Sequence, residues 1–177
     1  MIATKLPATL HECYKSFGNI ASYAQSPFLL LVRLYWGWQF AQTGWGKLHN
    51  LPQIAGFFTS LNLPFPAFTA AFVAWVEFLG GILLILGLLS RFTGLVLAIN
   101  MSVAYWTADH EALTSVISDP GKFYVADPYT FLFASLMVLI FGAGLFSLDR
   151  LLAQWTLNKY WGMDATRSEQ ETVPVEI

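Results

Sequence analysis

Long apolar stretches alternate with short polar ones along this chain, and the pattern predicts four helices that cross a membrane. The apolar stretches cover residues 27–46, 66–89, 92–107 and 129–146. Most are close to the roughly 20 residues that a helix needs to cross a hydrocarbon core of about 30 Å. The third is shorter, so its helix is expected to stand nearly upright or to continue past Ala108. Only two residues separate the second and third stretches, so their helices are expected to be antiparallel neighbours.

Both ends of the chain carry a weaker pattern that predicts helices on the membrane surface. Residues 8–26 place apolar side chains at helical spacing among polar ones, which is typical of an amphipathic surface helix; a flexible lead-in is the alternative. Residues 148–163 predict a second interfacial helix with aromatic anchors. The acidic tail 164–177 has no apolar period, so we expect it to be disordered. The expected fold is therefore an all-α membrane protein, with an N-terminal segment 1–26, a four-transmembrane-helix bundle 27–147, the surface helix and the tail.

Composition supports a membrane protein and excludes several classes of function. The chain is 56% hydrophobic and 11% charged, whereas soluble domains carry about a quarter charged residues. A net charge of −2 gives no basic face for nucleic acid. The single cysteine, Cys13, excludes an intramolecular disulfide and an iron–sulfur cluster ligated by this chain alone. No residue spacing predicts a metal, flavin or nucleotide site, so we expect no metal and no covalently bound cofactor.

The positive charges flanking the apolar stretches predict the orientation of the chain. With four spans both termini lie on the same side, and that side collects Lys5, Lys15, Arg91, Arg150, Lys159 and Arg167. The opposite side has Lys47 and Lys122. Since cytoplasmic flanks carry the excess of Lys and Arg, we expect a multi-pass protein of the cytoplasmic (inner) membrane with both termini in the cytoplasm.

The first apolar stretch carries two positive charges on one side of its helix. Read at intervals of four, three, four and three, the residues on this side are Arg33, Gly37, Phe40, Gly44 and Lys47. A charge near the bilayer centre costs at least roughly 2.5–3.5 kcal/mol. This side is therefore expected to face other helices, water or a ligand rather than lipid.

The second stretch carries one charge, Glu77, about halfway along its length. At a rise of about 1.5 Å per residue, Glu77 and Gln39 lie at similar depth, and Asn100 lies between that depth and Arg33. We therefore predict a polar cluster of Arg33, Gln39, Glu77 and Asn100 inside the bundle. Two interpretations stay open: an Arg33–Glu77 pair that only sets helix register, or a site for a ligand or a proton.

The residues near this predicted cluster also allow two interpretations each. Gly80 and Gly81 either make room for a flat ring beside Glu77 or let helices approach closely. Lys47 and His49, beyond the first span, either hold an anion or a quinone oxygen or belong to an interfacial belt of polar and aromatic residues.

These residues also resemble a known family. The run Arg33-x3-Gly37-x2-Phe40-x3-Gly44-x2-Lys47-Leu48, then Glu77-x2-Gly80-Gly81, then Gly87-x3-Arg91, resembles the DoxX family of small four-helix membrane proteins. The resemblance covers about residues 28–147. It implies a four-helix bundle in the cytoplasmic membrane that is often linked to membrane redox chemistry. The related DoxD-type proteins are subunits of a thiosulfate:quinone oxidoreductase.

The resulting hypothesis is a membrane subunit of an oxidoreductase system that binds a quinone or a similar apolar ring. Arg33 would orient Glu77, and Glu77 would accept or relay a proton. Lys47 and His49 would hold a polar head group. The expected ring-binding residues are Lys47, His49, Gln39, Asn100, Gly80 and Gly81, and the expected partner besides lipid is a redox protein or a second copy of the chain. The alternatives are a non-catalytic anchor or assembly partner and, less favoured because broken-helix signatures are absent, a small transporter.

Overall fold

The structure is a computed structural model that describes residues 8–156, within which the regular elements are all helices. The four longest helices are α1 (Ala8–His49), α3 (Pro66–Leu86), α4 (Ser90–Thr107) and α7 (Pro128–Phe141). Three short helices connect them: α2 (Leu51–Ser60), α5 (His110–Thr114) and α6 (Pro120–Val125). A further helical stretch covers residues 148–156.

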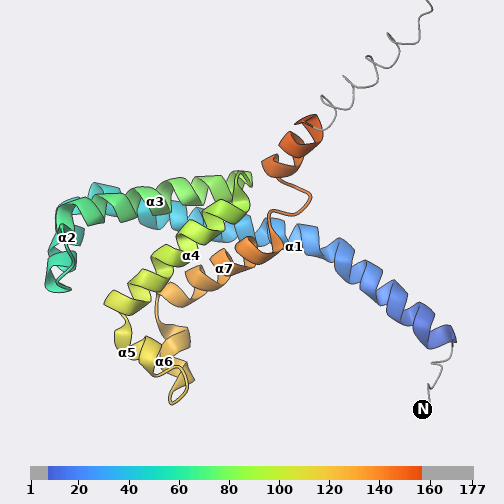
Figure 1. Cartoon of the computed structure of the whole chain (residues 1–177), viewed down its shortest axis with the longest axis horizontal. Coiled ribbons are helices and arrows are strands. Elements are labelled where there is room, and N and C mark those ends of the chain that lie inside the picture. The colour runs from blue at the N-terminus through green and yellow to red at the C-terminus, as the bar shows by residue number, and fades with distance from the viewer. Residues whose placement is uncertain (1–7, 157–177) are drawn as a thin grey trace, which may run out of the picture.

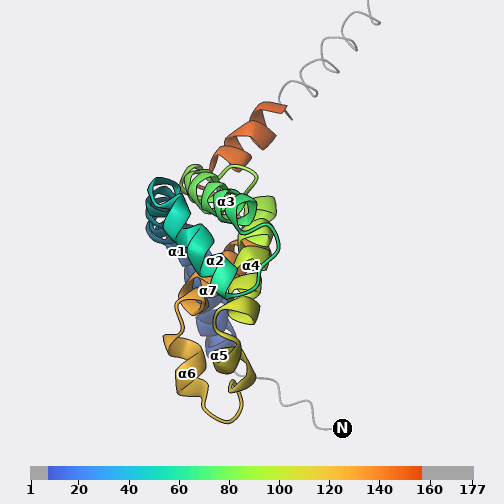
Figure 2. The ribbon, with the colours of Figure 1, turned by 90° about the vertical axis from the view of Figure 1, so that its left-hand side faces the viewer.

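The long helices form two packed pairs. Helix α1 lies along α3 and α4 lies along α7, and contacts of α3 with α4 and of α1 with α7 join the pairs (Figure 1). Helix α2 covers the end of the bundle at which α1 ends and α3 begins, whereas α5 and α6 link α4 to α7 (Figures 1 and 2). The four long helices share one apolar core, which contains Phe40, Leu84, Leu97, Met101 and Val138.

Small residues bring the backbones of α1 and α3 into direct contact. A Cβ atom added at Gly44 would lie 2.7 Å from the Phe78 Cα and 2.8 Å from the Ala74 carbonyl oxygen. A Cβ atom added at Gly81 would collide with the backbone of Ala41. Both glycines are therefore needed for this close approach, which is the usual reason for small residues between packed membrane helices.

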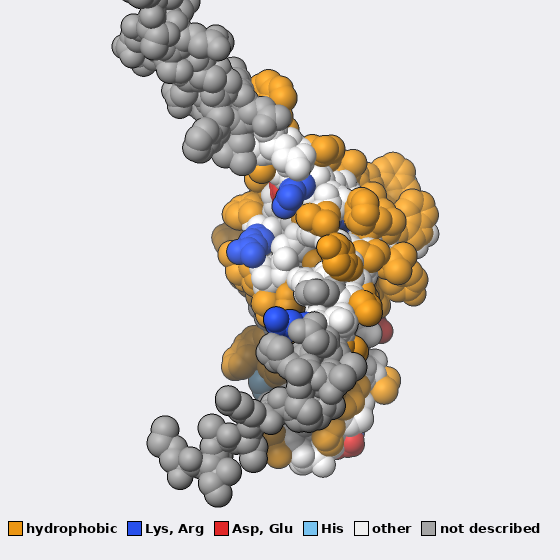
Figure 3. All heavy atoms as spheres, turned by 90° about the vertical axis from the view of Figure 1, so that its right-hand side faces the viewer, with side chains coloured by type: hydrophobic (Ala, Val, Ile, Leu, Met, Phe, Trp, Pro, Cys, Tyr) orange, Lys and Arg blue, Asp and Glu red, His pale blue; other side chains and the backbone are white. Residues whose placement is uncertain are grey.

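The outer surface of the bundle is strongly apolar. Large hydrophobic side chains are exposed along all four long helices, and Figure 3 shows one face on which they predominate. Such an extended apolar surface is typical of a membrane or protein interface. Among the described helices, α3 alone is both long and apolar enough to cross a membrane, and α7 is apolar but has only 14 residues. Four complete spans therefore stay a prediction.

Several helix boundaries differ from those predicted. The expected surface helix 8–26 does not separate from the first span, because α1 continues through Pro27 as one helix of 42 residues. The fourth helix ends at Phe141 rather than at residue 146, because Gly142 and Gly144 adopt φ values of 77° and 74° that favour glycine. Of the expected helix 148–163, the first nine positions are helical and the rest, like the tail 164–177, lies outside the described residues.

Candidate ligand-binding site

A pocket of about 230 Å³ lies under α2, between the end of α1 and the facing sides of α3 and α4. Most of its wall is apolar or aromatic and comes from all of these elements. The apolar lining residues are Ile54, Phe57, Phe58, Leu61, Leu63, Val73, Val103, Ala104 and Ala108, and the polar ones are Lys47, Thr69, Glu77, Asn100 and Thr107. An apolar cavity with a few placed polar groups is the usual form of a small-molecule site.

Three of the polar side chains meet at one carboxylate oxygen. The ammonium of Lys47 lies 2.5 Å from Glu77 Oε1, and the amide Nδ2 of Asn100 donates to the same oxygen at 3.2 Å. The Glu77 side chain is 2% exposed and that of Lys47 is 30% exposed. The second oxygen, Glu77 Oε2, is buried and has no hydrogen-bond partner among the described residues. Since an ionised carboxylate accepts about four hydrogen bonds, Glu77 keeps unused acceptor capacity.

Two glycines position this group of three residues. Gly44 packs against the α3 backbone at Phe78, which is next to Glu77, and Lys47 follows one helical turn later on the same side of α1. On the other side of α3, Gly80 admits the side chain of Leu97 from α4, where an added Cβ atom would lie 2.9 Å from Leu97 Cδ2. Asn100 comes one turn after Leu97. The ion pair and the amide contact thus follow from close helix packing.

Sequence comparisons relate this chain to a protein family and to a bacterial relative. The sequence model of the DoxX family matches residues 28–110. The chain is therefore similar to the DoxX family over these residues. An uncharacterised protein of Haemophilus influenzae is 28% identical over 138 residues, which cover 75% of this chain and 88% of the relative. No solved structure matches the chain significantly. The matched range contains Lys47, Glu77 and Asn100.

The predicted pairing of Arg33 with Glu77 is wrong. Lys47 takes this place, and Arg33 lies 14 residues earlier on α1, which is about 21 Å along the helix axis. Spacing alone does not decide between two cations on one side of a helix. The charged cluster that was expected around Arg33 is therefore shifted toward the α2 end of the bundle.

Arg33 instead binds backbone carbonyl groups at the opposite end of the bundle. Its side chain is fully buried, and its guanidinium donates to the carbonyl oxygens of Leu84 at 3.1 Å, of Phe146 at 2.9 Å, and of Ala143. These carbonyls belong to the last turn of α3 and to the irregular segment after α7. Because unpaired backbone groups are costly in an apolar environment, Arg33 stabilises this segment, and its role in the structure is one of packing.

The other residues predicted for the site lie outside the pocket. Gln39 is half-buried on α1 and does not line the pocket. His49 is exposed, and its Nδ1 lies 2.9 Å from the carbonyl oxygen of Trp45, one turn earlier on α1. Gly80 packs against Leu97 of α4 and Gly81 against the α1 backbone at Ala41, which agrees with the close-packing interpretation. Gly80 also lines a separate apolar pocket of about 290 Å³ between α3 and α4.

Sequence reasoning missed the α2 side of the pocket. Within α2 and the turn that follows, Ile54, Phe57, Phe58 and Leu61 recur at intervals of three, one and three, and Pro52 lies in the first turn of the helix. This spacing is typical of an amphipathic helix with one apolar side. The signal was therefore present, in a stretch too short to cross a membrane.

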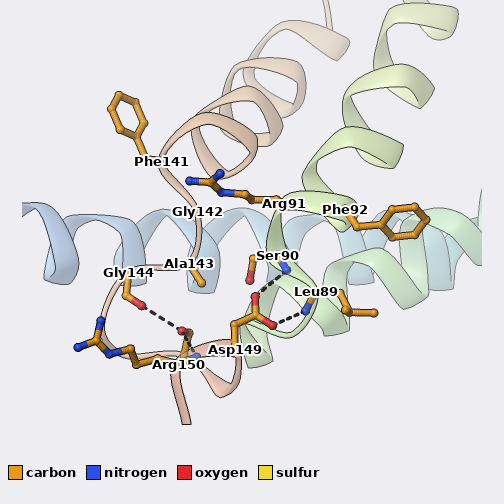
Figure 4. A pocket seen from close by; sticks show the side chains of 11 residues that line it. Leu89, Ser90, Arg91, Phe92, Phe141, Gly142, Ala143, Gly144, Asp149 and Arg150 are labelled. Atoms are coloured by element: carbon orange, nitrogen blue, oxygen red, sulfur yellow. Dashed lines mark hydrogen bonds between the residues drawn. The ribbon is translucent and has the colours of Figure 1, made fainter. Parts of the chain in front are cut away.

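A second, more open pocket of about 520 Å³ lies near Arg33, at the start of α4 (Figure 4). The carboxylate of Asp149 accepts hydrogen bonds from the backbone N–H groups of Leu89 and Ser90 at 2.7 and 2.8 Å. Asp149 thus satisfies N–H groups that a helix start leaves unpaired and ties the segment after α7 to α4. Figure 4 shows the guanidinium groups of Arg91 and Arg150 separated from each other, with that of Arg91 beside Gly142.

Proposed function

We propose that this protein is an integral membrane protein that binds a quinone or a similar small apolar ring in the pocket under α2. In this proposal it serves as the membrane subunit of an oxidoreductase system and supplies no metal or flavin of its own. The observation that carries the proposal is Glu77, a buried carboxylate that lines an apolar pocket and has one oxygen without a partner among the described residues. Ionisable groups buried in membrane helices mark functional sites by default.

The size and lining of the pocket suit one ring. An apolar cavity of about 150 Å³ holds benzene, so a pocket of about 230 Å³ accepts a ring with a few small substituents. Phe57 and Phe58 of α2 line the pocket, and aromatic side chains pack favourably on other rings. Lys47 has two ammonium hydrogens left after its contact with Glu77, and either can donate to an oxygen of the ring.

The proposed setting is a cytoplasmic membrane that α1, α3, α4 and α7 all cross. The apolar outer surface of these helices supports this arrangement. With both termini in the cytoplasm, α2 and the pocket lie toward the outer side of the membrane, and Arg33 lies toward the cytoplasm. Ring access from the lipid or from a partner protein then occurs near the outer interface.

Ligand binding by matched variants tests the proposal. The purified full-length protein is titrated with a tail-less, methyl-substituted 1,4-benzoquinone, and Kd is measured calorimetrically. Lys47→Met is expected to weaken binding of the quinone at least about tenfold, since it removes the charged donor to a ring oxygen. Glu77→Gln is expected to change the Kd, because it alters the group that holds the Lys47 ammonium. The controls Lys122→Met and Glu111→Gln make the same chemical changes at exposed positions outside the pocket. Equal Kd values in all four variants would refute the proposal.

An anchor without chemistry is the second candidate function. It is favoured by the observation that the buried charges also hold helices together: Lys47 with Glu77 joins α1 to α3, and Arg33 joins α1 to the segment after α7. The anchor predicts that the double variant Lys47→Met with Glu77→Gln accumulates normally and keeps its partner proteins and full activity of the system. Purification from native membranes, followed by mass spectrometry of co-purifying proteins and quinones, distinguishes the two functions.

A further inference from the structure

We infer that the pocket recognises a ring hydroxyl, so that it binds the reduced, hydroxyl-bearing form of a ring more tightly than the oxidised, carbonyl-bearing form. This inference rests on the proposed function, because it concerns the same pocket and specifies the chemistry of its ligand. It follows from the hydrogen-bonding groups that the pocket still has available once its internal contacts are made.

The free acceptors belong to Glu77 and Asn100. Glu77 Oε2 has no partner among the described residues, and a carboxylate accepts but does not donate. Because Glu77 Oε1 is an acceptor, the amide of Asn100 must direct its N–H₂ group at it, which leaves the Asn100 carbonyl oxygen as another acceptor. The polar side of the pocket therefore has unused acceptors for a ligand that donates a hydrogen bond.

The two hydroxyl groups in the wall already donate to backbone carbonyl groups. Thr69 donates to the carbonyl oxygen of Pro64 at 2.8 Å, and Thr107 donates to that of Val103 at 2.9 Å. The donors that remain among the described lining side chains are the Lys47 ammonium and the second amide hydrogen of Asn100.

A ring carbonyl and a ring hydroxyl use these groups differently. The carbonyl accepts a hydrogen bond from Lys47 but leaves Glu77 Oε2 unpaired in an apolar pocket, which is unfavourable. The hydroxyl accepts from Lys47 and also donates to Glu77 Oε2. A site that hydrogen-bonds a hydroxyl discriminates strongly against analogues that lack it. One additional hydrogen bond to a charged group corresponds to about tenfold tighter binding or more.

Four probes built on the same methyl-substituted ring test the inference on the full-length wild-type protein. These are a methyl-substituted 1,4-benzoquinone, its hydroquinone, the corresponding phenol and the corresponding methyl ether, each titrated calorimetrically without oxygen. The phenol and the ether do not interconvert by redox chemistry, so they separate hydroxyl recognition from reactivity. We expect the hydroquinone and the phenol to bind at least about tenfold more tightly than the quinone and the ether.

The outcomes separate this inference from the proposed function. If the quinone and the ether bind as tightly as the hydroxyl compounds or more tightly, hydroxyl recognition is overturned and ring binding stands. If none of the four probes binds, the proposed function fails and the inference fails with it. The wild-type series is sufficient for this decision, so it does not depend on any variant folding.

A variant then assigns the preference to one atom. Glu77→Gln replaces one acceptor oxygen by an N–H₂ donor, so the preference for hydroxyl compounds is expected to disappear or to reverse toward the carbonyl form. The exposed control Glu111→Gln is expected to keep the wild-type preference. A folded Glu77→Gln protein that retains a tenfold preference for the phenol over the ether would overturn recognition by Glu77.

Discussion

Replacement of Arg33 by methionine tests the interpretation that this buried charge stabilises the irregular segment after α7. Methionine keeps much of the side-chain length and removes the guanidinium. In the structure this group donates to three carbonyl oxygens, those of Leu84, Ala143 and Phe146. The Leu84 oxygen also accepts a hydrogen bond from the N–H of Gly87 at 3.1 Å, so the substitution does not leave it unpaired.

The expected loss of stability follows from the two remaining carbonyls. Each loses the donor that the structure shows for it, and an unsatisfied buried acceptor costs about 1–3 kcal/mol. The sum is roughly 2–6 kcal/mol. Because methionine also avoids the burial of a charge, which by itself opposes folding, we expect a value in the lower half, about 2–4 kcal/mol.

The assay is reversible unfolding in mixed micelles, with the free energy extrapolated from the denaturing detergent fraction. Arg33→Lys is the informative comparison, because a single ammonium does not match the planar, forked geometry with which Arg33 serves three carbonyls. It should recover only part of the loss. Arg91→Met, which removes an exposed cation at the same end of the bundle, is the control. A change below about 1 kcal/mol for Arg33→Met, or full recovery by lysine, would refute the reasoning.

Two further predictions concern helix packing and pH. Gly44→Ala should destabilise the protein by about 1–3 kcal/mol, because the added Cβ atom collides with the α3 backbone at Phe78. The control Gly46→Ala, whose added Cβ atom has nothing within 4 Å, should be neutral or slightly stabilising in thermal unfolding. Equal effects of the two substitutions would contradict the packing of α1 against α3. Burial, and secondarily the negative charge of Asp127, raise the pKa of Asp109 above its usual value. The contribution of Asp109 to stability is therefore complete below the ordinary pKa of 3.8 and is lost as the pH rises through the raised pKa. If the dependence of unfolding on pH between about 3 and 7 is the same in Asp109→Asn as in the wild type, this prediction is wrong.

The helices themselves were predictable, because their signals are local. Four apolar stretches indicated four long helices, and each one is present, with ends that differ by a few residues. The largest differences lie at residues 8–26, where α1 continues through Pro27, and at 142–146, where α7 has already ended. Composition does not reveal either boundary. The start of α1 depends on the continuity of a helix that extends beyond the bundle. The end of α7 depends on the conformations of two glycines in a segment to which the distant Arg33 donates hydrogen bonds.

The candidate site was only partly predictable. Lys47, Glu77 and Asn100 each stand out in the sequence as polar residues in apolar surroundings, and the structure brings these three together. The aromatic cover formed by α2 was missed, although its apolar spacing is visible in the sequence. With 10 residues, α2 is too short to cross a membrane, so the length criterion for a membrane span does not detect it.

The sequence by itself determined that the chain is helical, that charged faces on two helices must avoid lipid, and that small residues lie beside those charges. These properties depend on period, apolarity and side-chain size, which are local. The tertiary structure alone decided which cation meets Glu77. Arg33 and Lys47 lie on the same side of α1, and the choice depends on where Gly44 lets the α1 backbone touch α3. That contact involves residues more than 30 positions apart in the chain, and the spacing within one helix carries no information about it.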